Sequence, residues 1–449
     1  MKKLIIALIA ALISACLILP KVIASKHQDA ITKMIDKLDS TPGYKATLVS
    51  TQSAWFGSFN TVDIAFDLGD IDHSARGKTI TATLNLDTQY GPLLFSEQGL
   101  IGLYETQVRF DGQEQRSYLE WDATQPLYQL SVLTGLSGKT QLNDQIPPFS
   151  TLDNALSFSG YAGEGVIGDD TFTYYAGAEQ LTITDRGESL VAKGFTFSID
   201  LAASLNDIMQ GGFYDGVAST QLDSLTAAGI LDLSGLSINM KTALDSETNL
   251  GYLELGYLLD DLLFKDFTAS DLVFVSQLNN LNNDFFLNYN QAIKKTGTNN
   301  ASNDVYDNLA VFLQNNVGSL LASQPEFNIS SFSGVLAGGN FNANLSSKLA
   351  NTEAPTLDEM TQPGFWLYNT IASAKVEMDA SLAHVAAEQF LASKMRSSAN
   401  SLRVKRDAER MISQLIEQGL IKQQGEQYSS EFSLEKGQGN LNGNVFPVM

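Results

Sequence analysis

Histidine and cysteine are the side chains that most often carry chemistry in proteins, and this sequence holds few of them. It contains three histidines, His27, His73 and His384, and one cysteine, Cys16. A three-histidine zinc centre would need all of the histidines, which follow no ligand spacing. One cysteine excludes an intramolecular disulfide and any metal site built from several cysteines. We therefore expect no metal and no cofactor.

A glycine string also invites a chemical interpretation. GEGVIG, residues 163–168, matches the G-x-G-x-x-G pattern that holds pyrophosphate at a helix N-terminus. That role needs a helix directly after the string, so that free backbone N–H groups face the phosphate. Here Asp169, Asp170 and a run of strand formers follow, and the two carboxylates would repel phosphate. We interpret the string as a glycine-rich turn between strands.

Carboxylates offer two further candidates. DLGDIDHSARG, residues 67–77, gathers three aspartates and His73, but it lacks the ligand spacing of a helix-loop-helix calcium site. We interpret it as an acidic loop at a strand end. Asp260 and Asp261 could serve a glycosidase, although adjacency does not establish a catalytic pair. No nucleophile motif occurs for His73 or His384 to assist, so we assign no catalytic residue and expect a protein that is not an enzyme.

The charge balance restricts the partners. The 449 residues include 28 Lys and Arg against 50 Asp and Glu, a net charge of −22. Phosphate backbones would be repelled, so we expect no nucleic-acid partner. The same field opposes flat docking on anionic headgroups, so any lipid contact should be made inside a groove or pocket. Hydrophobic residues make up 44%, which describes a folded body rather than a polytopic membrane protein.

The N-terminal segment decides where the body is located. Lys2 and Lys3 precede an apolar run of about 21 residues that ends near Ala24, and a helix of that length can span a bilayer. Three outcomes stay open: retention of residues 1–24 as an anchor, cleavage near Ala24, or lipid attachment at Cys16. Each outcome exports the body. We expect retention, with a single anchor in the bacterial inner membrane and the body in the periplasm.

Residues 25–43 continue the helical pattern beyond the apolar run. Apolar residues recur there at i, i+3, i+4 and i+7 spacing, at Ile31, Met34, Ile35 and Leu38. The pattern ends before Pro42 and Gly43. We therefore expect a helical stalk between the anchor and the body.

Residues 44–293 are dominated by alternation of apolar and polar residues, which is typical of antiparallel strands with one wet face. VDIAFDL, residues 62–68, places four apolar side chains on one side and two aspartates on the other. TITATLNLD and GFTFSIDL repeat the pattern, and LTITDRGESL predicts a hairpin. We expect a mainly antiparallel β region over these residues.

Residues 294–449 show helical periodicity in several segments between strand patterns. We expect a mixed helix and strand region that completes the same body. We expect helices over residues 304–325, from Val385 onward, and around residues 411–416. Strands first and mixed elements later favour an α+β, β-rich class. We expect extended antiparallel sheets, a few helices in the C-terminal half, and an N-terminal membrane-anchor helix before them.

Several phenylalanines fall on the apolar faces of the expected strands, at Phe66, Phe195, Phe197 and Phe432. Core packing is the default interpretation of such side chains, and lining a ligand site is the alternative. Alternation assigns a side chain to a face but does not show what covers that face.

The C-terminal text is the most recognisable part of the chain. LIEQGLIKQQGEQYSSEFSLEKGQGNLNG, residues 415–443, contains a helix end at Gly419, a strand from Tyr428 and the ending NLNG. It resembles the closing segment of the YdgA-like family, exported bacterial proteins of unknown function, as do the early AWFGSFNT and the GPL at residues 91–93. Tyr90 stands where that family usually shows histidine. The resemblance implies an inner-membrane-anchored periplasmic protein with no established reaction, and it carries over no catalytic residue.

Three functions stay open. We favour non-enzymatic binding of a lipid or other hydrophobic ligand in the cell envelope, because long one-sided strands can cover an apolar cleft. The second is an envelope scaffold or assembly factor that engages another protein or a copy of itself. The third is an envelope hydrolase that uses dispersed carboxylates or His73.

Overall fold

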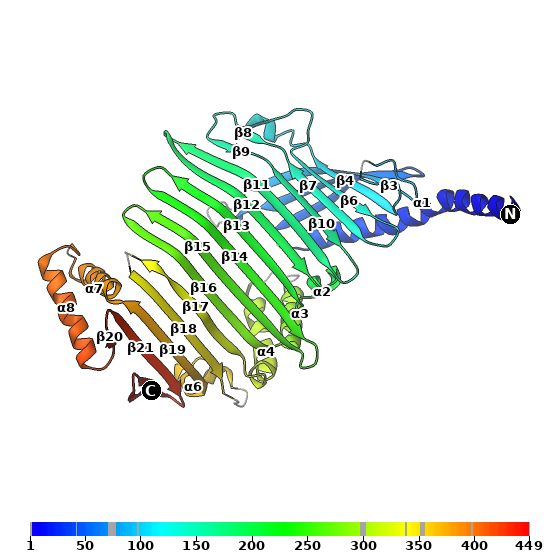
Figure 1. Ribbon diagram of the computed structural model, residues 1–449. Helices are drawn as coiled ribbons and strands as arrows, with labels where there is room; N and C mark the ends of the chain where they lie inside the picture. The colour runs from blue at the N-terminus through cyan, green and yellow to red at the C-terminus, as the bar shows by residue number, and fades with distance from the viewer. Residues whose placement is uncertain are drawn as a thin grey trace. The chain divides into compact units, whose positions relative to one another are not determined.

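The protein is a β-rich α+β molecule built on long antiparallel strands (Figure 1), as the alternation predicts. The computed structural model describes residues 2–41, 43–70, 78–96, 98–296, 302–336, 339–350, 355–396 and 398–448. The chain divides into two compact units. The first unit comprises Met1–Gly187, Gly194–Met209 and Lys294–Asn300, and the second comprises Glu188–Lys193, Gln210–Ile293 and Ala301–Met449.

The first unit contains one run of antiparallel neighbours. In order these are β1 (Tyr44–Ser53), β2 (Gly57–Asp67), β3 (Thr79–Tyr90), β4 (Tyr104–Phe110), β6 (Tyr128–Thr134), β7 (Thr140–Ile146), β10 (Tyr161–Ile167) and β11 (Phe172–Asp185). Three short strands continue from β11, namely β9 (Leu156–Phe158), β8 (Phe149–Thr151) and β5 (Leu119–Trp121). The predicted alternation of VDIAFDL lies in β2, where Val62 is buried and Asp63 is exposed.

Helix α1 (Lys2–Asp39) contains Pro20 and contacts β1, β2 and β3. Residues 25–39 of the expected stalk are therefore the C-terminal part of a longer helix, and this helix contacts the sheet. Among the residues that the structure describes, no helix is long and apolar enough to cross a membrane.

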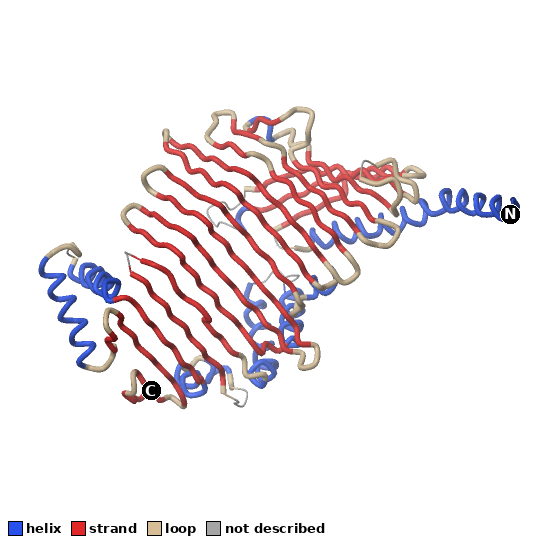
Figure 2. Tube along the Cα trace, in the orientation of Figure 1, coloured by secondary structure: helices blue, strands red, loops and turns tan. Residues whose placement is uncertain are grey.

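The second unit contains a longer run of antiparallel strands, drawn red and side by side in Figure 2. In order these are β13 (Gly216–Ala227), β14 (Leu231–Asp245), β15 (Leu250–Phe264), β16 (Phe267–Asn282), β17 (Glu326–Leu336), β18 (Gly339–Leu349), β19 (Thr370–Asp379), β21 (Gln427–Glu435), β22 (Gln438–Leu441) and β23 (Asn444–Pro447). β20 (Lys422–Gln424) pairs with the start of β21. β12 (Glu188–Leu201) contributes residues to both units.

The remaining helices are α2 (Leu205–Gln210), α3 (Asn283–Thr296), α4 (Ser302–Ala322), α5 (Leu357–Met360), α6 (Pro363–Asn369), α7 (Ala380–Met395) and α8 (Leu402–Glu417). Helices α4, α7 and α8 occupy the three predicted helical segments, although α7 begins at Ala380 rather than near Val385. The alternating pattern does not predict α3. The side chain of Asn282 starts it by accepting a hydrogen bond from the backbone N–H of Phe285 (2.9 Å), and the buried Phe285 ring packs on Phe312 of α4 at 5.4 Å.

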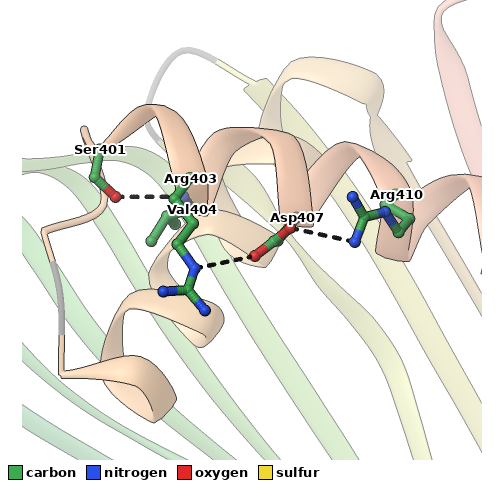
Figure 3. Close-up of polar contacts among 5 residues, drawn as sticks. All are labelled: Ser401, Arg403, Val404, Asp407 and Arg410. Carbon is green, nitrogen blue, oxygen red and sulfur yellow. Dashed lines mark hydrogen bonds and ion pairs between the residues drawn. The ribbon is translucent and has the colours of Figure 1, made fainter.

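Helix α8 shows how the C-terminal elements are fixed (Figure 3). Ser401 caps the helix by accepting a hydrogen bond from the backbone N–H of Val404 (3.3 Å). On the solvent side, Asp407 lies 3.9 Å from Arg403 and 3.5 Å from Arg410. The opposite side of the helix is buried and contributes Val404, Ala408 and Ile412. Ala408 and Ile412 form a small core with Ala387 of α7 and Tyr428 of β21.

Candidate functional site

The histidine and cysteine candidates belong to different parts of the chain. His27 lies in α1 of the first unit and His384 in α7 of the second, while His73 falls outside the described residues. Cys16 lies in the part of α1 whose side chains are not described. Within the described part of the chain, no group of three His, Cys, Asp or Glu side chains could hold a metal ion.

His27 fastens α1 to the sheet. Its Nε2 lies 3.0 Å from Thr106 Oγ1 and its Nδ1 lies 3.4 Å from the Tyr90 hydroxyl. Tyr90 in turn bonds Ser58 Oγ at 2.7 Å, and the Tyr104 ring lies 4.5 Å from the imidazole. Burial lowers the pKa of His27 to about 4 and raises the pKa of Tyr90. The imidazole is therefore neutral at neutral pH, and its hydrogen bonds attach α1 to the sheet.

A second polar contact lies beside it. Asn60 is fully buried in β2, and its Oδ1 accepts hydrogen bonds from Thr51 Oγ1 (2.8 Å) and Gln28 Nε2 (3.3 Å). Consecutive residues of α1, His27 and Gln28, thus meet the sheet through hydrogen bonds. These bonds help to fix the position of the helix, because a shift of α1 would break all of them and leave the buried imidazole of His27 without its two partners.

The glycine string lies in β10 and the turn after it, and β11 follows rather than a helix. A phosphate cradle is therefore absent at residues 163–168. The glycines have a packing role instead. A Cβ atom at Gly163 would collide with the Tyr174 hydroxyl and the Asp144 carboxylate, and one at Gly165 would collide with the Thr173 carbonyl (2.8 Å) and the Tyr174 ring (2.9 Å).

The cluster around Gly163 is the feature that sequence reasoning missed. Tyr174 donates a hydrogen bond to Asp144 Oδ1 (2.8 Å), Tyr128 donates to Oδ2 (3.4 Å), and the hydroxyls of Tyr161 and Tyr174 are in contact. The four side chains come from β6, β7, β10 and β11. Burial, helped by the carboxylate, raises the pKa of Tyr128 and Tyr174, so these hydroxyls stay protonated. In the sequence only one feature points to this cluster: the alternation of TQLNDQI, residues 140–146, places Asp144 on the same side as Leu142 and Ile146.

The second unit presents a continuous apolar surface on one side of its sheet. Directly opposed residues share a face, and the register links Tyr257, Phe274, Phe332, Ala343 and Val376 from β15 to β19. We call this side the apolar face. It also carries, among others, Met240, Leu255, Ile329, Leu345, Ala374 and Phe432 in one neighbouring row.

Four rings form a ladder across the apolar face. The ring centroids of Tyr257 and Phe274 are 6.1 Å apart, those of Phe274 and Phe332 are 5.8 Å apart, and those of Phe332 and Phe341 are 5.0 Å apart. Within the second unit the ladder remains open, because Tyr257 is 43% exposed and Phe332 is 45% exposed. Contiguous exposed apolar surface can mark a binding surface, so the apolar face is the candidate site of the second unit.

The opposite side, which we call the polar face, is mostly polar in β18 and β19, although β15 and β16 place Leu258 and Val273 on it. β18 shows the contrast most clearly, because Phe341, Ala343 and Leu345 are half-buried whereas the residues between them are exposed. Those alternating exposed residues are Asn340, Asn342, Asn344, Ser346 and Lys348. β18 therefore has one wet side and one apolar side, as period-two alternation predicts.

The other sequence candidates lie apart from the ladder. Asp261 accepts a hydrogen bond from Ser234 at 3.5 Å and lines a hollow of about 580 Å³ with Thr268 and Val335. The adjacent Asp260 points at Gly235. The two carboxylates therefore do not converge on one point, and they are not arranged as a glycosidase pair.

Two of the candidate phenylalanines pack on other rings, one is exposed, and one lies on the apolar face. Phe66 packs on Tyr44 at 4.7 Å and Phe197 on Tyr174 at 6.4 Å. Phe195 is 40% exposed. Phe432 lies on the apolar face opposite Ala374.

A family model described as a bacterial protein of unknown function (DUF945) matches residues 1–449. No curated protein matches the chain, and no solved structure does.

Proposed function

Since the chain belongs to the DUF945 family of bacterial proteins of unknown function, we propose a function on physical grounds: it binds a lipid or another hydrophobic molecule without catalysing a reaction. The binding surface is the apolar face of the second unit. The observation that carries the proposal is the aromatic ladder, in which Tyr257 and Phe332 are exposed.

The apolar face offers favourable energy to a hydrophobic ligand. Tyr257 and Phe332 expose 43% and 45% of their surface, and aromatic side chains of about 200 Å² each would then offer roughly 180 Å² to a ligand. At about 25 cal/mol per Å², covering these two rings alone contributes about 4 kcal/mol. Neighbouring aliphatic side chains of the apolar face add to that, and no charged group is required.

We also propose that the protein is exported and held at the bacterial inner membrane by residues 1–24, with the body in the periplasm. Two lysines followed by an apolar run support export, as does the YdgA-like resemblance of residues 415–443. Cleavage near Ala24 or lipid attachment at Cys16 would also place the body in the envelope.

The test is native mass spectrometry of the full-length protein, purified from bacteria in a non-ionic detergent that is removed in the gas phase. We expect bound masses with lipid fragments. Phe332→Gln should weaken binding by about 2 kcal/mol, or about 30-fold in Kd, because it removes about half of the estimated aromatic contribution.

A matched pair on β19 provides the control. Val376 lies on the apolar face and Ile371 on the polar face, and both are 36% exposed. Val376→Gln should reduce lipid occupancy, whereas Ile371→Gln should leave it unchanged. A wild-type protein without bound lipid, or equal losses in both variants, would overturn the proposal. Dimers or a co-purifying envelope protein without lipid would favour a scaffold role instead.

A further inference from the structure

Asp144 is an ionisable side chain among apolar neighbours on the sheet of the first unit. Along β7 it shares a face with Leu142 and Ile146, and across the strands it is opposed by Leu130 of β6 and Gly163 of β10. A carboxylate on such a face is costly unless something compensates its charge. The question is what that partner is.

The protein supplies only hydroxyl groups. Tyr174 and Tyr128 donate to the two oxygens of Asp144 at 2.8 and 3.4 Å, and among the described residues no ion pair involves this carboxylate. A carboxylate has about four acceptor positions, and each phenol keeps lone pairs after donating. Both kinds of oxygen therefore still have acceptor positions free.

A glycine in β10 leaves the space that the cluster occupies. Gly163 stands directly opposite Asp144, and any Cβ there would strike the Asp144 carboxylate and the Tyr174 hydroxyl. Asp144, Tyr128, Tyr161 and Tyr174 are all half-buried rather than sealed, so a small group can reach them. The residues thus form an open, oxygen-rich and negatively charged site bordered by aliphatic side chains.

We propose that Asp144, Tyr128, Tyr161 and Tyr174 bind the primary ammonium head of an amphiphile. An ammonium group has three donors, which suit one carboxylate and the neighbouring phenol oxygens. Leu130, Leu142 and Ile146 on the same face would contact the start of its apolar part. The overall charge of −22 also favours a cationic head over an anionic one. This site belongs to the first unit, whereas the apolar face belongs to the second, so the inference adds a second binding site for an amphiphile to the proposed function.

The test is a competition on the full-length protein in non-ionic detergent, read by native mass spectrometry. Equal amounts of phosphatidylethanolamine and phosphatidylglycerol with the same acyl chains are offered. We expect wild type to prefer phosphatidylethanolamine by about tenfold or more, since a charged hydrogen bond is worth that factor. Asp144→Asn should bring the ratio toward one while total lipid occupancy persists. Asp63→Asn, an equal charge change on an exposed position of β2, should keep the preference.

A second arm uses wild type alone and does not depend on how a variant folds. Phosphatidylethanolamine competes with its N-acetylated form, which has lost the charge and two donors, and we expect the unmodified lipid to win by about tenfold. Equal binding of the two lipids, or a preference that survives Asp144→Asn, would overturn the inference and leave the proposed function standing. Absence of any bound lipid in wild type would refute both.

Discussion

Acid should loosen the attachment of α1 through His27. The side chain is 8% exposed and its pKa in the folded protein is about 4, against 6.5 for a free histidine. Above pH 6.5 both the folded and the unfolded chain hold a neutral imidazole, so its contribution is fully present. As the pH falls below 6.5 the unfolded chain takes up the proton first, and stability is lost until the pH passes below about 4.

The size of the loss follows from the two pKa values. A tenfold difference in proton affinity is about 1.4 kcal/mol, so protonation of His27 should cost about 2 kcal/mol at pH 5 and about 3 kcal/mol at pH 4. The groups that face the imidazole are Tyr90, Tyr104 and Thr106. None of them is a carboxylate or a basic side chain, so no ion pair with His27 offsets the effect.

The assay is urea unfolding of full-length protein from pH 7.5 to pH 4, with hydrogen exchange of residues 18–39 as a local reading. Many carboxylates titrate in the same range, so the informative quantity is the difference between wild type and His27→Gln. We expect the free energy of unfolding of wild type to fall by about 3 kcal/mol more than that of His27→Gln between pH 7.5 and 4. His384→Gln should keep the wild-type loss, since His27 is still present. If the free energy of unfolding falls equally with pH in wild type and in His27→Gln, His27 is not a buried neutral side chain that holds α1 on the sheet.

Two further predictions concern packing and are read from urea midpoints. Gly163→Ala should destabilise by about 1–3 kcal/mol, because its methyl group must displace Tyr174 or Asp144; Glu164→Ala on the opposite side of β10 is the control, and an equal effect would refute the role of Gly163. Ile412→Ala should lower the free energy of unfolding by about 2–5 kcal/mol, because Ile412 is 4% exposed in the small core between α7, α8 and β21. Leu402→Ala on the same helix should cost less than about 0.5 kcal/mol, and similar losses in both would contradict the orientation of α8.

Alternation predicted the strands because it reflects local burial. In NFNANLS each apolar residue is half-buried and each polar one exposed, so residues 340–346 carry enough information to place a strand and its faces. The helix over residues 283–296 escaped prediction, because its start depends on Asn282 as a cap and on Phe285 packing against α4. Such a contact joins segments that are distant in the sequence.

The candidate site was less accessible to sequence reasoning than the fold. The aromatic ladder requires the register of four strands, and a shift of one residue would turn its rings to the other face. The Asp144 cluster also depends on register, since Tyr128 and Tyr174 lie on strands that flank β7 and β10. His27 was considered as a zinc ligand in the sequence, and only the packing of α1 on the sheet shows that its nitrogens are already occupied.

The central claim is that the apolar face of the second unit holds a hydrophobic ligand, and photocrosslinking tests it most directly. Full-length protein is incubated with a phospholipid that carries a diazirine in its acyl chain, then irradiated and digested. The account predicts labels on apolar-face residues of β15 to β19, such as Phe332 and Val376, and fewer labels in Phe332→Gln. Labels spread equally over polar-face residues such as Asn342, or no labels at all, would contradict it.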